Sequence, residues 1–420
     1  MLDRSASPIF QTITDFSFIH AISQSLDNGV AMHIIDAGTQ PVIRLEIVFN
    51  YGKWNENKNQ ASLFTSKMLL EGTDQKSSVE ISEIIDGYGA FIEVTPGVDY
   101  TTVSLYCIHE FLKPLLELLS EVLNYPSFPG EELSKVKNIQ AQALKINLEK
   151  NSYLASNYFR QRLFGNNHPY GRILRQDSIE DINSDDVNSF YQELNRTQRE
   201  LIISGQITSK VIDQIKHVFD KQAYSPEVFS KTHEVETSNI PQVENKKDSL
   251  QSSLRIGKLM VKKDDKEFHK IFIANTLLGG FFGSRLMKNI REEKGLTYGI
   301  QSSVPVLLNS GYFVITADVI KQNKDLAIQE IYSELKLLRT KLPTKSEMEI
   351  LRNYLTGTFQ SEINTPFSLA DKFKSVHLYG LDYDYYDNLF TTIQNCKPSD
   401  ITSTAEKYFN EDSMLSVAVG

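Results

Sequence analysis

One pattern occurs twice in this chain of 420 residues: Phe128-Pro-Gly-Glu-Glu-Leu-Ser-Lys-Val-Lys-Asn138 and Leu342-Pro-Thr-Lys-Ser-Glu-Met-Glu-Ile-Leu-Arg-Asn353. Each copy places a proline and acidic residues directly before apolar residues at helical spacing, which is typical of the start of a helix. Each copy also follows a stretch with apolar residues three and four apart, which predicts another helix. The apolar positions of these preceding stretches are Leu112, Leu115, Leu116, Leu119 and Val122 in the first and Leu326, Ile328, Ile331, Leu335 and Leu338 in the second.

The same order continues toward the N-terminal side of both copies. Thr102–Cys107 and Tyr312–Ala317 have the β-branched and aromatic composition of strands. Earlier still, helical patterns run over Ser78–Gly87 and Arg285–Glu293. This shared order predicts a duplicated α+β unit, in which each copy has a mainly antiparallel sheet covered by helices. Chance similarity between two α+β halves is the alternative.

The stretch between Lys221 and Leu254 differs in character from its surroundings. Polar side chains dominate there, and the apolar periodicity disappears. Such a stretch is typical of a linker. We therefore expect an N-terminal domain over residues 1–220, a linker over 221–254 and a C-terminal domain over 255–420, and both domains have an ordinary size.

Two local patterns in the first half add detail. Leu26-Asp-Asn-Gly-Val30 contains an Asn-Gly turn of the hairpin type, and the apolar stretches Ala31–Ile35 and Val42–Phe49 that follow it predict paired strands. Tyr153–Phe164 predicts a helix that ends before a turn at His168-Pro-Tyr-Gly171. Asp177–Phe190 has the acidic, capped pattern of a surface helix.

Composition and charge exclude several classes of protein. The chain is 40% apolar and 23% charged, which is ordinary for a globular protein. With 44 basic and 53 acidic residues the net charge is −9, so no strongly basic surface for nucleic acid is expected. Cys107 and Cys396 are too few for a disulfide framework and are expected to be buried free thiols.

The sequence also predicts where the protein is found. No stretch has the length and apolarity of a membrane span. Met1–Pro8 carries no apolar segment of the signal-peptide type. We therefore expect a cytoplasmic protein, and a periplasmic location is the alternative if a signal peptide has been removed.

The sequence lacks the compact motifs of several common catalytic sites. The eight histidines are all more than five residues apart, so His-x-x-Glu-His and its inverse are absent from the sequence. No phosphate-binding loop and no Gly-x-Ser-x-Gly nucleophile motif occurs either. What remains is Arg291-Glu-Glu-Lys-Gly-Leu-Thr-Tyr298, in which an arginine, a helix-ending glycine and a tyrosine can converge. Arginine and tyrosine can both donate hydrogen bonds to a reacting carbonyl group. An ion pair of Arg291 at the helix end, with Glu292 or Glu293, is the alternative.

Four segments of the chain carry a family resemblance. They are Leu26-Asp-Asn-Gly29, Met68-Leu-Leu-Glu-Gly-Thr73, His168-Pro-Tyr-Gly171 and the long pattern Leu278-Gly-Gly-x-x-x-Ser-Arg-Leu-x-x-x-Ile-Arg-Glu-x-x-Gly-Leu-x-Tyr298. On these segments the chain resembles the M16 peptidase family of insulinase, pitrilysin and mitochondrial-processing-peptidase relatives, in its short two-domain form. The resemblance implies two duplicated LuxS/metallohydrolase-like domains, and halves or chains that face each other across a peptide-holding chamber.

The same resemblance indicates that the zinc centre of active family members is missing from this chain. Active members carry His-x-x-Glu-His directly before the Met-Leu-x-x-Gly-Thr segment and a further glutamate downstream. Here the two histidine positions hold Leu63 and Lys67, the general-base position holds Ser66, and the distal ligand position holds Ala143. Zinc needs about three protein donors, so we expect no zinc in this chain. The family's substrate strand corresponds to Gly89–Val94, where its usual Asn-Ala pair is replaced by Glu93 and Val94.

The Arg/Tyr pair of the family, by contrast, matches Arg291 and Tyr298. The resemblance implies that these two side chains position a peptide substrate in the zinc site of a partner chain. The leading hypothesis is therefore a zinc-free, Arg/Tyr-bearing subunit of a heteromeric M16 metallopeptidase, whose partner carries His-x-x-Glu-His and the zinc. The alternatives are an inactive peptide-binding or scaffold protein of the same fold, and a free-standing peptidase with an unrecognised metal site. When alone, the chain could form a homodimer.

Overall fold

The computed structural model describes residues 18–222, 224–238 and 240–420. Met1–Pro8, on which the expectation about a signal peptide rests, lies outside these residues. Two separate sheets are present, one in each half of the chain. Cys107 and Cys396 are both buried free thiols, as predicted. No helix in the described ranges is long and apolar enough to cross a bilayer.

The first sheet has six strands in the order β1-β2-β6-β3-β5-β4. All neighbours are antiparallel except β2 and β6, which are parallel. The strands are β1 Ile22–Ser25, β2 Ala31–Asp36, β3 Val42–Phe49, β4 Phe91–Pro96, β5 Thr101–Ile108 and β6 Arg199–Gly205. The helices of this half are α1 Ala61–Met68, α2 Ser78–Gly87, η1 His109–Phe111, α3 Leu112–Asn124, α4 Gly130–Leu148, α5 Asn151–Phe164, α6 Gln176–Asp181, α7 Ser184–Arg196 and α8 Ser209–Phe219.

The second sheet has five strands in the order β7-β11-β8-β10-β9, and again one pair, β7 with β11, is parallel. The strands are β7 Gln242–Glu244, β8 Gln251–Met260, β9 Thr297–Ser303, β10 Gly311–Ile320 and β11 Leu415–Val419. The helices are α9 Phe268–Asn275, η2 Thr276–Gly280, η3 Met287–Glu293, η4 Lys321–Asn323, α10 Lys324–Thr340, α11 Lys345–Ser361, α12 Pro366–His377, α13 Asp384–Asn395, α14 Pro398–Tyr408 and η5 Glu411–Ser413.

Both sheets follow one plan, because β2, β6, β3, β5 and β4 have the same neighbours and directions as β7, β11, β8, β10 and β9. The prediction of a duplicated α+β unit with mainly antiparallel sheets is therefore confirmed. The stretch 221–254 contains β7 and the first part of β8. The domain limits stay a prediction.

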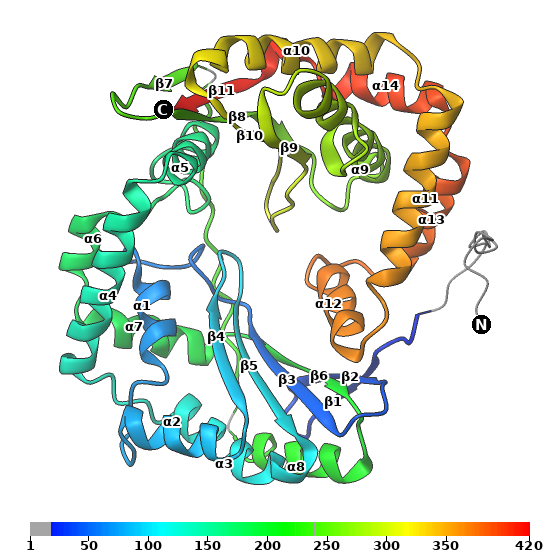
Figure 1. Cartoon of the computed structure of the whole chain (residues 1–420). Helices are drawn as coiled ribbons and strands as arrows, with labels where there is room; N and C mark the ends of the chain where they lie inside the picture. The colour runs from blue at the N-terminus through cyan, green and yellow to red at the C-terminus, as the bar shows by residue number, and fades with distance from the viewer. Residues whose placement is uncertain (1–17, 223, 239) are drawn as a thin grey trace, which may run out of the picture.

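One helix of each half crosses over to cover the sheet of the other half (Figure 1). Helix α5 packs against β8 and β11 of the second sheet, and α12 packs against β2 and β6 of the first. The remaining apolar residues form a separate core in each half. The two crossing helices therefore join the halves into one ring of elements, in which the edge strands β4 and β9 lie toward the middle (Figure 1).

Two local predictions were wrong. The strands β2 and β3 do not pair with each other, because β6 lies between them and pairs with both. The stretch Asp177–Phe190 forms parts of two helices, α6 and α7, and not one. Asn183 starts α7 with a capping box, in which its side chain accepts a hydrogen bond from Asp186 N–H and the Asp186 carboxylate accepts one from Asn183 N–H.

Candidate functional site

The positions that the resemblance assigns to the zinc centre lie on two helices that pack against each other. Leu63, Ser66 and Lys67 lie on α1, Ala143 lies on α4, and these helices contact each other. Leu63 is half-buried, Ser66 is buried, and Lys67 and Ala143 are exposed. The buried hydroxyl of Ser66 has no hydrogen-bond partner within the described part of the chain.

These residues do not fit a zinc ion. Leu63 and Ala143 have no donor atom, and the Lys67 ammonium would repel a cation. Ser66 offers only a hydroxyl where the reaction needs a general base. No hydrolytic step can therefore be assigned to this centre.

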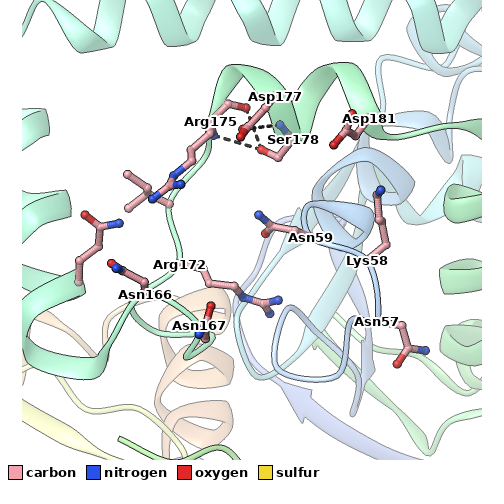
Figure 2. Close-up of a pocket in the computed structure, with 12 residues that line it drawn as sticks. Asn57, Lys58, Asn59, Asn166, Asn167, Arg172, Arg175, Asp177, Ser178 and Asp181 are labelled. Carbon is pink, nitrogen blue, oxygen red and sulfur yellow. Dashed lines mark hydrogen bonds between the residues drawn. The ribbon is translucent and has the colours of Figure 1, made fainter. Parts of the chain in front are cut away.

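A polar pocket of about 420 Å³ lies beside the N-terminal end of α1. Figure 2 shows the side chains around it, which come from the loop before α1, from α5 and the loop that follows it, and from helix α6. Its lining is Asn57, Lys58, Asn59, Gln161, Asn166, Asn167, Arg172, Ile173, Arg175, Asp177, Ser178 and Asp181. The four positions of the missing centre are not part of this lining, and Arg172 is already paired with Glu56 at 3.2 Å. Sequence analysis missed this pocket because no compact motif marks it.

Arg291 lies on η3, which has π-helical hydrogen bonding, a feature that is frequent at functional sites. Its guanidinium group sits over the ring of Phe282, with the carbon Cζ 4.7 Å from the ring centre. Phe282 itself is 64% exposed. Among the described residues Arg291 forms no ion pair, and in particular none with Glu292 or Glu293. The helix-end ion pair considered from the sequence is therefore not formed.

Three polar or charged residues near Arg291 in the sequence contact α10 or α11. Arg285 pairs with Glu347 on α11 at 2.8 Å, and Asn289 donates a hydrogen bond to Glu334 on α10 at 2.7 Å. Lys294 pairs with Glu330, also on α10. These contacts hold this segment against α10 and α11, whereas the Arg291 guanidinium contacts the ring of Phe282.

The backbone explains why two positions of the motif are glycine. A Cβ atom at Gly279 would lie 2.7 Å from the backbone nitrogen of Ser302 on β9, so only glycine allows this close approach. Gly295 has φ +61°, in the left-handed region, and it turns the chain from η3 into β9. The motif thus positions Tyr298 close after the helix that carries Arg291.

Tyr298 is the most exposed aromatic side chain in this region, at 90%. It lies on β9, which is an edge strand of the second sheet and pairs only with β10. The structure therefore brings the two second-half residues onto adjacent elements, as it does separately for the four first-half positions. Exposure of the phenol could not be predicted from the sequence.

The strand that corresponds to the family's substrate strand is β4, the edge of the first sheet. Glu93 is exposed on it and Phe91 is 56% exposed. Asp99, just beyond β4, accepts hydrogen bonds from the Tyr170 hydroxyl at 2.7 Å and from the backbone N–H of Leu308 at 3.1 Å. Burial raises the pKa of Asp99. Asp99 thus links the two halves, a role that sequence analysis did not predict.

A duplicated α+β fold with an exposed Arg/Tyr motif, in which the positions assigned to the hydrolytic zinc centre hold Leu63, Ser66, Lys67 and Ala143, defines a metallopeptidase-like protein. The sequence profile described as insulinase (peptidase family M16) matches residues 32–173, and the profile described as peptidase M16 inactive domain matches residues 181–355. The chain belongs to the M16 peptidase family, in its short two-domain form.

Named relatives agree with this assignment. The chain is 21% identical over 394 residues to a Bacillus subtilis protein named "Uncharacterized zinc protease YmxG", covering 93% of this chain and 96% of the relative. It is 24% identical over 374 residues to a Helicobacter pylori protein named "Non-peptidase homolog YmxG", covering 86% and 85%. The crystal structure of a peptidase M16 inactive domain from Pseudomonas fluorescens superposes with a TM-score of 0.84 at 22% identity, over 95% of this chain and 98% of that one.

Proposed function

We propose that this chain is the subunit without a hydrolytic zinc centre in a two-chain M16 peptidase, in which Arg291 and Tyr298 position the peptide substrate in the partner's zinc site. The proposal rests on the exposure of Tyr298 and on the contacts of Arg291. Tyr298 is 90% exposed on an edge strand, and Arg291 lacks an ion-pair partner among the described residues. An exposed phenol and a guanidinium group without an ion-pair partner in the described residues are both able to donate hydrogen bonds to a bound peptide.

The chemistry of the pair suits carbonyl recognition. A guanidinium group donates charged hydrogen bonds, and a phenol can donate one to an oxygen that becomes negative in the transition state. Neither group cleaves a peptide bond without an activated water. The zinc, the general base and the water must therefore come from a second M16 chain that carries His-x-x-Glu-His. A cytoplasmic location forms part of this proposal.

The test mixes this chain with such a zinc-bearing M16 chain from the same organism and measures kcat/KM on a peptide library. We expect the mixture to exceed the partner alone. Arg291→Ala and Tyr298→Phe should each lower kcat/KM on the order of 10²-fold, without changing the amount of complex seen by size-exclusion chromatography. The matched controls are Arg196→Ala and Tyr125→Phe, which alter exposed side chains elsewhere. Variants of Arg291 and Tyr298 that are as active as wild type would contradict the proposal.

A second candidate is a peptide-binding scaffold that takes no part in hydrolysis. One observation favours it: the Helicobacter pylori relative is named a non-peptidase homologue. In that case the chain binds peptides alone, and adding it to a zinc-bearing partner leaves kcat/KM unchanged. Fluorescence anisotropy with labelled peptides, measured beside the kinetic assay, separates the two candidates.

A further inference from the structure

Three metal-ligating side chains meet at the junction of the two halves. His33 lies on β2, Glu200 lies on the neighbouring strand β6, and His377 is the last residue of α12, which crosses over from the second half. The Nε2 atom of His33 is 3.3 Å from Glu200 Oε2, and the Nε2 atom of His377 is 2.6 Å from the same oxygen. One ligand atom from each of the three residues lies within 4.8 Å of the other two.

The donor set suits a transition-metal cation. Two imidazole nitrogens and one carboxylate oxygen are ligands that zinc prefers, and three protein ligands leave one coordination position open. Ligand atoms about 2.1 Å from a tetrahedral ion lie about 3.4 Å from one another. The observed separations, from 2.6 Å upward and all within 4.8 Å, lie around that value. Small side-chain rotations would therefore bring the three atoms onto one ion.

The surroundings provide an outer shell and an open position. The Nδ1 atom of His33 is 2.7 Å from the Ser23 hydroxyl, which orients the ring so that Nε2 faces Glu200. Metal-bound histidines almost always have such a partner on their other nitrogen. A cavity of about 160 Å³, lined by Glu200, His377, Asn50 and Tyr100 among others, adjoins the cluster. It is large enough for a water molecule as a fourth ligand.

We propose that His33, Glu200 and His377 bind a divalent transition-metal cation such as Zn²⁺. The site is distinct from the degenerate centre on α1 and α4, and it does not depend on the proposed function. The bound ion would tie α12 to the first sheet, because two ligands come from one half and the third from the other. The simpler reading is a hydrogen-bonded His–Glu–His contact, in which both Nε2 atoms carry protons and no ion binds.

The test uses the full chain, stripped with a chelator, dialysed and titrated with Zn²⁺ or Co²⁺. We expect one equivalent of Co²⁺ to bind and to produce the visible absorption of a four-coordinate ion, and we expect Zn²⁺ to displace it. His377→Ala and Glu200→Gln should each weaken binding at least tenfold, and Ser23→Ala should weaken it about 10- to 100-fold. The matched control His217→Ala, an exposed histidine outside the cluster, should bind as wild type does.

Each outcome of the metal titration either supports or overturns the proposed site. The side chain of His377 is 32% exposed, so its removal should leave the fold intact, and circular dichroism checks this for each variant. Binding that is lost in folded His377→Ala supports the site. Wild-type protein that binds no more Co²⁺ than a His33→Ala/Glu200→Gln/His377→Ala variant would overturn it, as would ligand variants that bind as tightly as wild type.

Discussion

The two crossing helices make contacts of opposite kinds with the sheets they cover. Helix α5 meets the second sheet through an apolar cluster. Its members are Leu154, Ala155, Phe159, Leu163 and Phe164 on the helix and Val314, Leu415, Val417 and Val419 on the sheet. Helix α12 meets the first sheet through a smaller apolar cluster of Leu369, Ala370 and Phe373 with Ile35, Val48 and Ile202.

Ion pairs make the difference between these contacts, since the buried Arg255 of β8 donates hydrogen bonds to neutral oxygens of Ser152 and Ser156 on α5. The α12 contact adds two ion pairs that cross between the halves, Arg44 with Asp371 at 2.9 Å and Glu46 with Lys374, and a hydrogen bond between His377 and Glu200. Arg44 and Glu46 are both buried on β3. Removing charges from water has a desolvation cost that offsets much of their attraction. We therefore expect the α5 contact to respond to side-chain volume, and the α12 contact to charge, salt and cations.

The largest expected effect is on the α5 contact. Phe159→Ala removes a ring that is 2% exposed and should lower the free energy of unfolding by about 3–5 kcal/mol. Urea denaturation followed by circular dichroism measures the change. Phe91→Ala, at a side chain that is 56% exposed, is the control and should change stability by less than about 0.5 kcal/mol. Equal effects of the two variants would break the comparison.

The next effect concerns the buried charges under α12. Glu46→Gln leaves the buried Arg44 guanidinium and Lys374 without their shared carboxylate, which should lower the free energy of unfolding by about 3 kcal/mol. Glu131→Gln, which breaks an exposed pair with Lys135, is the control and should have almost no effect. If Glu46→Gln is as stable as wild type, the charged contact is not what holds α12.

The pH dependence of stability tests the region that follows the C-terminal end of α5, where His168 lies. Burial lowers the pKa of His168 to about 4, with smaller contributions from His233 and Arg172. Its Nδ1 atom accepts a hydrogen bond from the N–H of Tyr170 at 3.1 Å. In the unfolded chain a histidine binds its proton near pH 6.5. Between pH 6.5 and 4 the unfolded state therefore binds more protons, and stability falls with falling pH by at most about 1.4 kcal/mol per pH unit.

His168→Gln removes this titration and should flatten the pH dependence of stability in that window. Above pH 6.5 it should leave the slope unchanged. Urea midpoints of wild type and variant at a series of pH values measure the difference. His217→Ala, at an exposed histidine, should keep the wild-type slope. A variant of His168 with the same slope as wild type would show that another group causes the acid sensitivity.

The smallest expected change in stability concerns Asp371, at the exposed edge of the α12 contact. The side chain of Asp371 is 56% exposed, so Asp371→Asn should lower the free energy of unfolding by only about 0.5 kcal/mol. The loss should shrink further at high salt, because screening weakens exposed pairs. Thermal melting at low and high salt measures both points. A loss of stability as large as that of Glu46→Gln would mean that burial does not make the Glu46 carboxylate more important for stability than the Asp371 carboxylate.

Local patterns predicted the elements of this fold well. The helix expected over Ser78–Gly87 has those same limits as α2, because a capping box at Ser77 and Glu80 marks its start within four residues. The repeated helix starts likewise predicted α4 and α11. Strand pairing was harder: β6 joins the sheet between β2 and β3 from a position more than a hundred residues later in the chain. No local signal specifies such a partner.

The candidate site, too, has features that the sequence predicted and features that only packing decided. Arg291 and Tyr298 belong to one continuous motif, and the resemblance located Leu63, Ser66, Lys67 and Ala143 by their spacing. The exposure of Tyr298 and the aromatic partner of Arg291 depend on how β9 and η3 pack, and they appeared only in the structure. No spacing motif marks the cluster of His33, Glu200 and His377, because these residues are far apart in the sequence.

By itself, then, the sequence determined the duplicated units, the loss of the zinc donors and the presence of the Arg/Tyr motif. The elements of each unit and the Arg/Tyr motif depend on residue types within a few positions of one another, where helical and strand periodicity and capping act. The positions of the zinc donors were assigned by the resemblance to the M16 family. The tertiary structure alone decided which helix covers which sheet, and it brought His33, Glu200 and His377 together from three distant parts of the chain. Such contacts form only when whole elements pack, because burial of their apolar faces, and not a local motif, selects the partner.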